Sequence, residues 1–183
     1  MEIHIIINEE VLFMGNAIMI EQVDTAVDYA HELAELLIRV VHDGASVGFL
    51  PPLSYEDAAA YWRSVLQTNI ILFAAKIDGQ IAGTVQLDLC TKQNGLHRAE
   101  IAKLMTHPGY RRKGIARLLM KAAEERLLLE KRSLVTLDTR EGDPSNLLYS
   151  SLGFIEAGRI PMYAKSEDGT LHATVFYYKI YDI

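Results

Sequence analysis

The chain has 183 residues, of which half are hydrophobic and 23% are charged, so it can form one domain with a full core but not two typical domains. The formal net charge of -6 repels a phosphate backbone, and the densest basic runs, at 111–113 and 131–132, are too short to follow a nucleic acid. We therefore expect no nucleic-acid partner. The single cysteine, Cys90, excludes an internal disulfide and a thiolate metal cluster, and it fits a reducing compartment.

The first sixteen residues are the part of the chain that is hardest to interpret. They are rich in isoleucine, but no Lys or Arg precedes the apolar positions and Glu9 and Glu10 follow them, which is typical of neither a signal peptide nor a transit peptide. No apolar run approaches the ~18 residues of a membrane-spanning helix, so we expect a cytoplasmic protein without a membrane partner. We interpret residues 1–16 as an N-terminal arm or extra strand, followed by one domain over residues 17–183.

The first predicted elements are a strand and a helix. An apolar run over residues 17–23 predicts the strand. Asp24 and Thr25 are suited to cap a helix that extends to His42, and Gly44 is suited to end it.

A second helix is predicted over residues 55–66, with Ser54 as its N-cap and Asp57 at the third helical position. Beyond this helix the apolar pattern becomes typical of strands. The remaining predicted elements are strands over 70–77, 81–90, 98–106, 133–139, 154–163 and 171–181, and helices over 114–130 and 145–152.

This order of elements predicts an α+β fold. A strand, a helix and another strand between residues 98 and 139 imply a parallel pair joined by a right-handed crossover. The turn residues Asp78-Gly79 and Glu167-Asp168-Gly169 predict hairpins on both sides of that unit. We therefore expect a mixed, mostly antiparallel central sheet that contains one parallel pair and has helices on both faces.

The segment from Leu104 to Ala116 carries the clearest chemical signal, because a strand, a basic loop and a helix start follow one another there. The first turn of a helix has unpaired N–H groups and a partial positive charge, which suit a pyrophosphate. Gly114 and Ala116 keep large side chains away, and the loop residues 111–113 add positive charge. The alternative is a solvated basic turn whose glycine serves only the backbone geometry. The chain contains neither G-x-G-x-x-G nor G-x-x-x-x-G-K-[ST] at such a position.

Two motifs resemble a known family. Arg111-x-x-Gly114-x-Ala116 after a strand is similar to the [QR]-x-x-G-x-[GA] pattern of the GCN5-related N-acetyltransferase (GNAT) family, and the segment 148–154 is similar to its L-Y-x-x-x-G-F pattern. The order of elements agrees with the family from about residue 17 to the end of the chain. Further segments, at 41–49, 94–100, 103–105 and 137–139, look similar to the tabtoxin-resistance type of acetyltransferase.

The resemblance implies a site for acetyl-coenzyme A between two splayed parallel strands. It assigns the pantetheine arm to the backbone of one strand and the pyrophosphate to the loop and the helix start. The pantetheine arm is assigned to Leu104, Met105 and Thr106. The pyrophosphate is assigned to Arg111, Arg112, Lys113, Gly114, Ile115 and Ala116. Many members have an asparagine seven positions before the motif tyrosine, where this chain has Gly142, so nearby Asn146 is a further candidate.

The resemblance also implies the catalytic residues. Tyr149 is the candidate for the acid that protonates the departing thiolate, although a tyrosine on a short amphipathic helix also suits a core. Glu100 matches the position of the base in some members, and Asp138 lies near the end of the neighbouring strand. Both carboxylates could instead form ion pairs, for example with Arg98, Lys103 or Arg140.

We therefore expect direct transfer of acetyl from acetyl-coenzyme A to a primary amine of a small molecule, such as an amino-acid-like toxin, an antibiotic or a polyamine. Three alternatives remain: a protein or peptide amine as acceptor, a longer acyl chain, and a module that senses acyl-coenzyme A without catalysis. The six histidines show no metal-ligand spacing, so we expect no metal. Exposed sheet edges make a homodimer a possible state.

Overall fold

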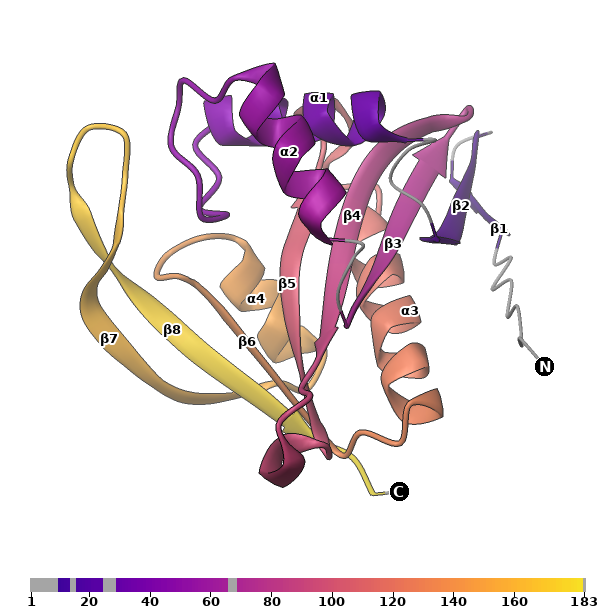
Figure 1. The fold of residues 1–183 in the computed structure, drawn as a ribbon, viewed down its shortest axis with the longest axis vertical. Coiled ribbons are helices and arrows are strands. Elements are labelled where there is room, and N and C mark those ends of the chain that lie inside the picture. The colour runs from indigo at the N-terminus through magenta and orange to yellow at the C-terminus, as the bar shows by residue number, and fades with distance from the viewer. Residues whose placement is uncertain (1–9, 14–15, 25–28, 66–68, 183) are drawn as a thin grey trace.

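A computed structural model describes residues 10–13, 16–24, 29–65 and 69–182. Its centre is an eight-stranded sheet in the order β1-β2-β3-β4-β5-β6-β8-β7, with α1 and α2 on one face and α3 on the other (Figure 1). The strands are β1 (Glu10–Phe13), β2 (Asn16–Val23), β3 (Ile70–Ile77), β4 (Gln80–Leu89), β5 (Arg98–Thr106), β6 (Leu134–Arg140), β7 (Ile155–Lys165) and β8 (Leu171–Ile180). The helices are α1 (Ala30–His42), α2 (Tyr55–Val65), α3 (Ile115–Leu129) and α4 (Ser145–Ser151), with single 3-10 turns η1 (Gln93–Gly95) and η2 (Pro108–Tyr110).

The sheet confirms the predicted mixed α+β fold. β5 and β6 are parallel, and the other neighbouring strands of the described chain are antiparallel. The parallel ladder is short, because it contains only the pairs Arg98–Leu134, Ala99–Val135 and Glu100–Thr136. Beyond Glu100 the two strands separate. We call this gap between residues 101–106 and 137–140 the β5–β6 opening.

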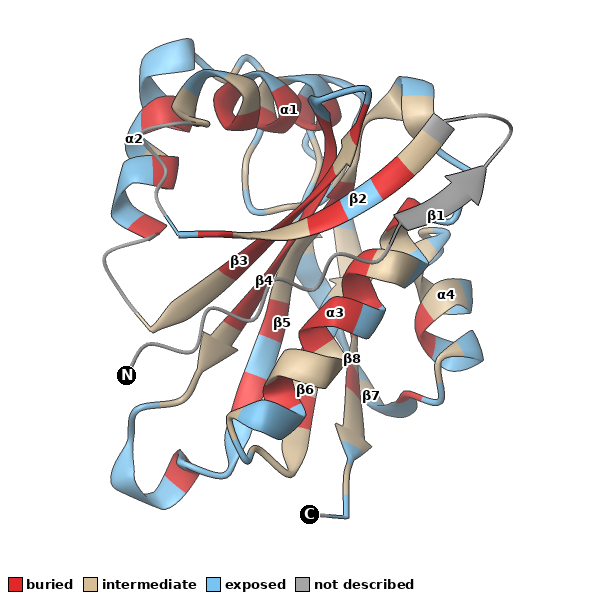
Figure 2. Cartoon of the chain, turned by 90° about the vertical axis from the view of Figure 1, so that its right-hand side faces the viewer, coloured by how far each residue is buried: buried red, intermediate tan, exposed pale blue. Residues whose placement is uncertain are grey.

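Two apolar cores cover the two faces of the sheet (Figure 2). The first core joins α3 to the sheet, and the second joins α1 and α2 to the opposite face. Ile101 belongs to the first core and Met105 to the second, although both lie on β5. A bulge between them explains the change of face, since Lys103 has a φ of 49° and the pairing with β4 shifts at this point. The bulge thus divides β5 into halves that expose different sides.

Two predicted helix caps can be compared with the structure. The capping of the first helix by Asp24 or Thr25 was wrong for Asp24, because α1 begins at Ala30 and the side chain of Asp24 accepts a hydrogen bond from Gln22. Thr25 lies outside the described residues. The cap of α2 is confirmed, since the N–H of Asp57 donates to the hydroxyl of Ser54 (3.0 Å).

The predicted arm over residues 1–16 contains a short strand. β1 pairs with β2 and extends the sheet, while residues 1–9 lie outside the described part of the chain. In the described residues, no helix has both the length and the apolar character needed to span a membrane.

Gly83 sets how closely α3 approaches the sheet. A Cβ added there would lie 2.6 Å from the carbonyl oxygen of Met105 and 3.0 Å from the side chain of Ile115. We expect Gly83→Ala to lower the free energy of unfolding by about 1–3 kcal/mol, because backbone atoms must move to admit the methyl group. Urea unfolding would measure this. Gly109→Ala is the control, since its Cβ would meet only the His107 side chain at 3.3 Å, and equal losses in both variants would contradict the close approach.

Candidate functional site

The β5–β6 opening exposes one edge of β5. Met105 and Thr106 pair with β4 on the other edge, at Thr84 and Gly83, but β6 does not pair with them. The side chain of Met105 is buried in the core beneath α1 and α2, and Leu104 packs against the core beneath α3. The backbone of this half-strand is therefore the part that can receive an extended ligand, as an added strand would be received.

The loop after β5 leads directly into α3. Arg112 and Gly114 adopt left-handed backbone conformations (φ of 62° and 81°), which turn the chain so that the helix begins at Ile115. The N–H of Leu118 donates to the carbonyl of Gly114 (3.1 Å). The N–H groups that precede Leu118 in the first turn consequently have no acceptor within the helix.

The first turn of α3 lacks the negative charge that the other long helices carry. Glu32 lies in the first turn of α1, and Glu56 and Asp57 lie in that of α2. α3 has no acidic residue there and no side-chain cap. Its positive end therefore remains uncompensated, which fits an anionic group.

The three basic residues of the loop have different surroundings. Arg111 forms an ion pair with Asp43 at the end of α1 (2.5 Å), so it also ties the loop to the opposite face of the sheet. The ammonium of Lys113 lies 5.2 Å from the ring centroid of Tyr110. Arg112 is exposed. The loop therefore places positive charge around the start of α3, although Arg111 is partly neutralised.

Tyr149 lies on α4 and is buried, with 5% of its surface exposed. Its ring packs between those of Phe154 and Tyr177, at centroid distances of 6.0 and 5.9 Å. Burial raises the pKa of Tyr149 strongly, and the nearby Asp138 and Asp143 carboxylates raise it further. The phenol is therefore protonated at neutral pH and can act as a hydrogen-bond donor or an acid.

Glu100 and Asp138 lie on the sheet face opposite α3. Their strand neighbours Ile101 and Leu137 belong to the core beneath α3, so the alternation of a strand directs the two carboxylates to the other side. Both side chains are accessible to solvent. Partial loss of hydration nevertheless raises the pKa of each, and the Asp138 and Asp88 charges raise that of Glu100 further. A raised pKa brings a carboxylate closer to the range that suits a general base.

The ion pairs considered as alternatives do not form within the described residues. Arg140 pairs with Asp143 (2.9 Å) and donates to the carbonyl of Gly44 (3.1 Å), which ties the end of β6 to the loop after α1. Lys103 affects the titration of Glu100 and Asp138 without an ion pair to either.

Asn146 has an internal role. Its side-chain amide donates to the carbonyls of Arg140 (2.9 Å) and Asp143 (2.8 Å), and it accepts from the hydroxyl of Tyr177 (2.9 Å). These three bonds hold the turn from β6 to α4 and place Tyr149. These bonds give Asn146 a role in this turn, and its contact with the cofactor stays a prediction.

Several residues near Glu100 were not among the predicted site residues. Lys103 was considered only as an ion-pair partner, and Asp88, Gln86 and Tyr61 were not considered. Val85 and Leu87 alternate with Gln86 and Asp88 along β4 and belong to the core beneath α3. Gln86 and Asp88 therefore lie on the other face, which is the face of Glu100. The alternation of polar and apolar residues along β4 indicates that Gln86 and Asp88 share one face. Only the pairing of β4 with β5 shows that this face is the one that carries Glu100.

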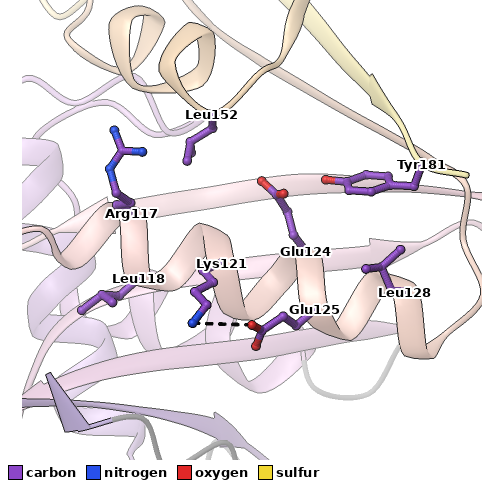
Figure 3. A pocket seen from close by; sticks show the side chains of 8 residues that line it. All are labelled: Arg117, Leu118, Lys121, Glu124, Glu125, Leu128, Leu152 and Tyr181. Carbon is purple, nitrogen blue, oxygen red and sulfur yellow. Dashed lines mark ion pairs between the residues drawn. The ribbon is translucent and has the colours of Figure 1, made fainter.

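A separate pocket of about 410 Å³ lies along α3 (Figure 3). It is lined by Arg117, Leu118, Lys121, Glu124, Glu125, Leu128, Leu152 and Tyr181. None of these belongs to the predicted site. Glu124 is held there by Lys179 (2.7 Å), which bridges α3 and β8.

Comparisons with known proteins agree with this geometry. The Acetyltransferase (GNAT) family matches residues 38–154. An uncharacterized N-acetyltransferase from the hisH-hisA intergenic region of Azospirillum brasilense is 31% identical over 128 residues, which are 68% of this chain and 76% of the relative.

Solved structures share the fold. A proposed acetyltransferase from Acinetobacter baylyi ADP1 has a TM-score of 0.80 and 21% identity, over 93% of this chain and 96% of that one. The yncA protein from Salmonella typhimurium, solved with its cofactor acetyl-CoA, has a TM-score of 0.75 and 15% identity, over 90% and 94% of the two chains. The family match and the relative from Azospirillum brasilense show the family. The chain belongs to the GNAT family and is an acetyl-CoA-dependent N-acetyltransferase.

Proposed function

We propose that this protein transfers acetyl directly from acetyl-CoA to a primary amine of a small molecule, as a GNAT enzyme of the tabtoxin-resistance type. The observation that carries the proposal is the electrostatic coupling at the β5–β6 opening. The Asp138 carboxylate raises the pKa of both Tyr149 and Glu100, so the protonated phenol and the two carboxylates influence one another electrostatically. Perturbed titrations that share a partner are typical of reaction centres.

The cofactor contacts follow from the exposed edge and the helix start. The backbone of Leu104, Met105 and Thr106 receives the pantetheine arm, and residues 111–116 receive the pyrophosphate. Acetyl-CoA supplies the activated acetyl thioester. The uncompensated start of α3 supports this assignment, because a helix N-terminus without acidic residues favours an anion.

The protonation states of Glu100 and Tyr149 suggest their catalytic roles. Glu100 accepts the proton of the acceptor ammonium, Asp138 keeps the pKa of Glu100 raised, and Tyr149 donates a proton to the sulfur of the leaving thiolate. Cys90 follows β4 and lies beside Arg98, at the end of β5 remote from the loop 107–114. The proposed transfer is direct and uses no acyl-cysteine.

A charge placed in the first turn of α3 tests the pyrophosphate site. We expect Ala116→Glu to weaken acetyl-CoA binding by about 10-fold or more, because a carboxylate would oppose the phosphates. The same carboxylate should leave the free energy of unfolding unchanged or raise it by about 0.3–1 kcal/mol, since it complements the helix dipole. Calorimetric titration and urea unfolding measure the two effects. Unchanged affinity in Ala116→Glu would contradict the assignment.

The experiment that tests the function has two steps. Isothermal titration with acetyl-CoA comes first, followed by a thiol-release screen over small amines and peptide amines. Binding together with release on small amines supports the proposal. Release only with peptide amines would point to a protein acceptor, and binding without turnover would point to a sensor. Light scattering on the same sample reports whether the protein forms the proposed homodimer, for which the exposed edge strand β7 is available with Ile155, Ile160 and Met162.

A further inference from the structure

Lys103 has an unusual place at the edge of the proposed acceptor site. It forms the β5 bulge, where the pairing passes from Gln86–Ala102 to Thr84–Met105. The hydroxyl of Thr84 donates to the carbonyl of Lys103 (3.2 Å), which fixes the bulge. The bulge interrupts the regular alternation of side chains along β5, and the ammonium of Lys103 lies on the side of α2.

The ammonium is partly enclosed by α2 and by the loop between α1 and α2. It lies 5.7 Å from the ring centroid of Tyr61, whose hydroxyl exchanges hydrogen bonds with the buried Gln86 amide (3.1 and 2.9 Å). The ring of Phe49 packs edge-on against Tyr61 at 5.2 Å. A Cβ at Gly48 would lie 3.7 Å from the Lys103 nitrogen, so the loop approaches the ammonium with a residue that has no side chain.

Lys103 forms no ion pair or side-chain hydrogen bond within the described part of the chain, although Glu100 and Asp138 are near enough to influence it. Loss of hydration lowers the pKa of Lys103, and the two carboxylates oppose this effect. An ammonium that has lost part of its hydration without a bonded partner favours an incoming anion. The site thus holds two carboxylates and one cation that contacts the Tyr61 ring but no acceptor oxygen of the described residues.

We propose that Lys103 selects an acceptor that carries a carboxylate as well as the reacting amine, so that the substrate is a free amino acid or a close analogue. This inference rests on the proposed acetyltransferase function. The substrate ammonium lies at Glu100 and Asp138, and the substrate carboxylate lies at Lys103. The two carboxylates of the protein complement the ammonium of such a molecule, and the Lys103 ammonium complements its carboxylate. A polyamine would place a second cation against Lys103, and like charges in contact disfavour binding.

Matched acceptors test the selection. Each amino acid is compared with its carboxamide, which keeps the amine and removes the carboxylate charge, using the wild-type protein, Lys103→Met and Lys103→Arg. We expect Lys103→Met to lower kcat/KM for the amino acid by about 10- to 100-fold, mainly through KM, because one charged hydrogen bond is lost. The value for the carboxamide should change less than about threefold, and Lys103→Arg should restore part of the preference. Lys92→Met, at an exposed lysine outside the site, should leave both values unchanged.

Binding gives a second measurement that does not depend on turnover. Titration of the amino acid into the protein saturated with coenzyme A should show affinity that Lys103→Met weakens by a similar factor. If the wild-type protein acetylates carboxamides or polyamines as well as amino acids, and Lys103→Met lowers all of them equally, Lys103 is structural and the inference is wrong while the acetyltransferase function stands. If the wild-type protein acetylates no amine, the proposed function itself fails.

Discussion

Tyr149→Phe should lower kcat by about 100- to 10,000-fold, which is the range for loss of a positioned acid. The phenol has a raised pKa because it is buried, so it holds its proton until the thiolate forms. Phenylalanine keeps the ring contacts with Phe154 and Tyr177 and removes only the hydroxyl. Affinity for acetyl-CoA should therefore change little. Steady-state thiol release measures kcat, and calorimetry measures the affinity.

Tyr177→Phe is the matched control for this result. It also removes one buried-ring hydroxyl, and that hydroxyl donates to Asn146. We expect a loss of about 1 kcal/mol in the free energy of unfolding and a change in kcat below about tenfold. If Tyr149→Phe retains more than about a tenth of the wild-type kcat, the phenol is not the acid.

Glu100→Gln should lower kcat/KM by about 100-fold or more, because the acceptor ammonium loses the carboxylate that accepts its proton. The base must be ionised, so kcat/KM falls as the pH decreases through its pKa. Partial loss of hydration, the Asp138 charge and the Asp88 charge raise the pKa of Glu100, whereas Lys103 lowers it. The decline therefore begins at a higher pH than it would for an ordinary glutamate.

The pH profile of Asp138→Asn separates the two carboxylates. Removing the Asp138 charge lowers the pKa of Glu100, so the acid-side decline should move to lower pH. The lost charge also faces the substrate ammonium, so KM should rise while kcat at neutral pH remains. Division of each profile by that of the wild type removes the titration of the acceptor amine. Loss of activity in Asp138→Asn, with Glu100→Gln still active, would make Asp138 the base.

The sequence by itself determined the local elements and pointed to the proposed phosphate site. The apolar runs of β3, β4 and β8, the cap at Ser54 and the helix after Gly114 depend on neighbours a few residues apart, and local sequence patterns record such neighbours. The motif at Arg111–Ala116 likewise lies in one continuous segment. The order of these elements sufficed for the fold class, because crossover handedness and hairpin turns restrict the possible sheets.

The proposed acceptor site depends on the tertiary structure. β5 and β6 separate after Glu100, and the bulge at Lys103 changes the face that β5 exposes. The bulge turns Lys103 to the face of Glu100, and Asp138 lies on the same face of the neighbouring strand β6. Alternation along one strand does not reveal a bulge or the point at which a ladder ends, because both depend on the partner strands. Asn146 shows the same limit, since only the folded turn reveals that its amide already has three partners.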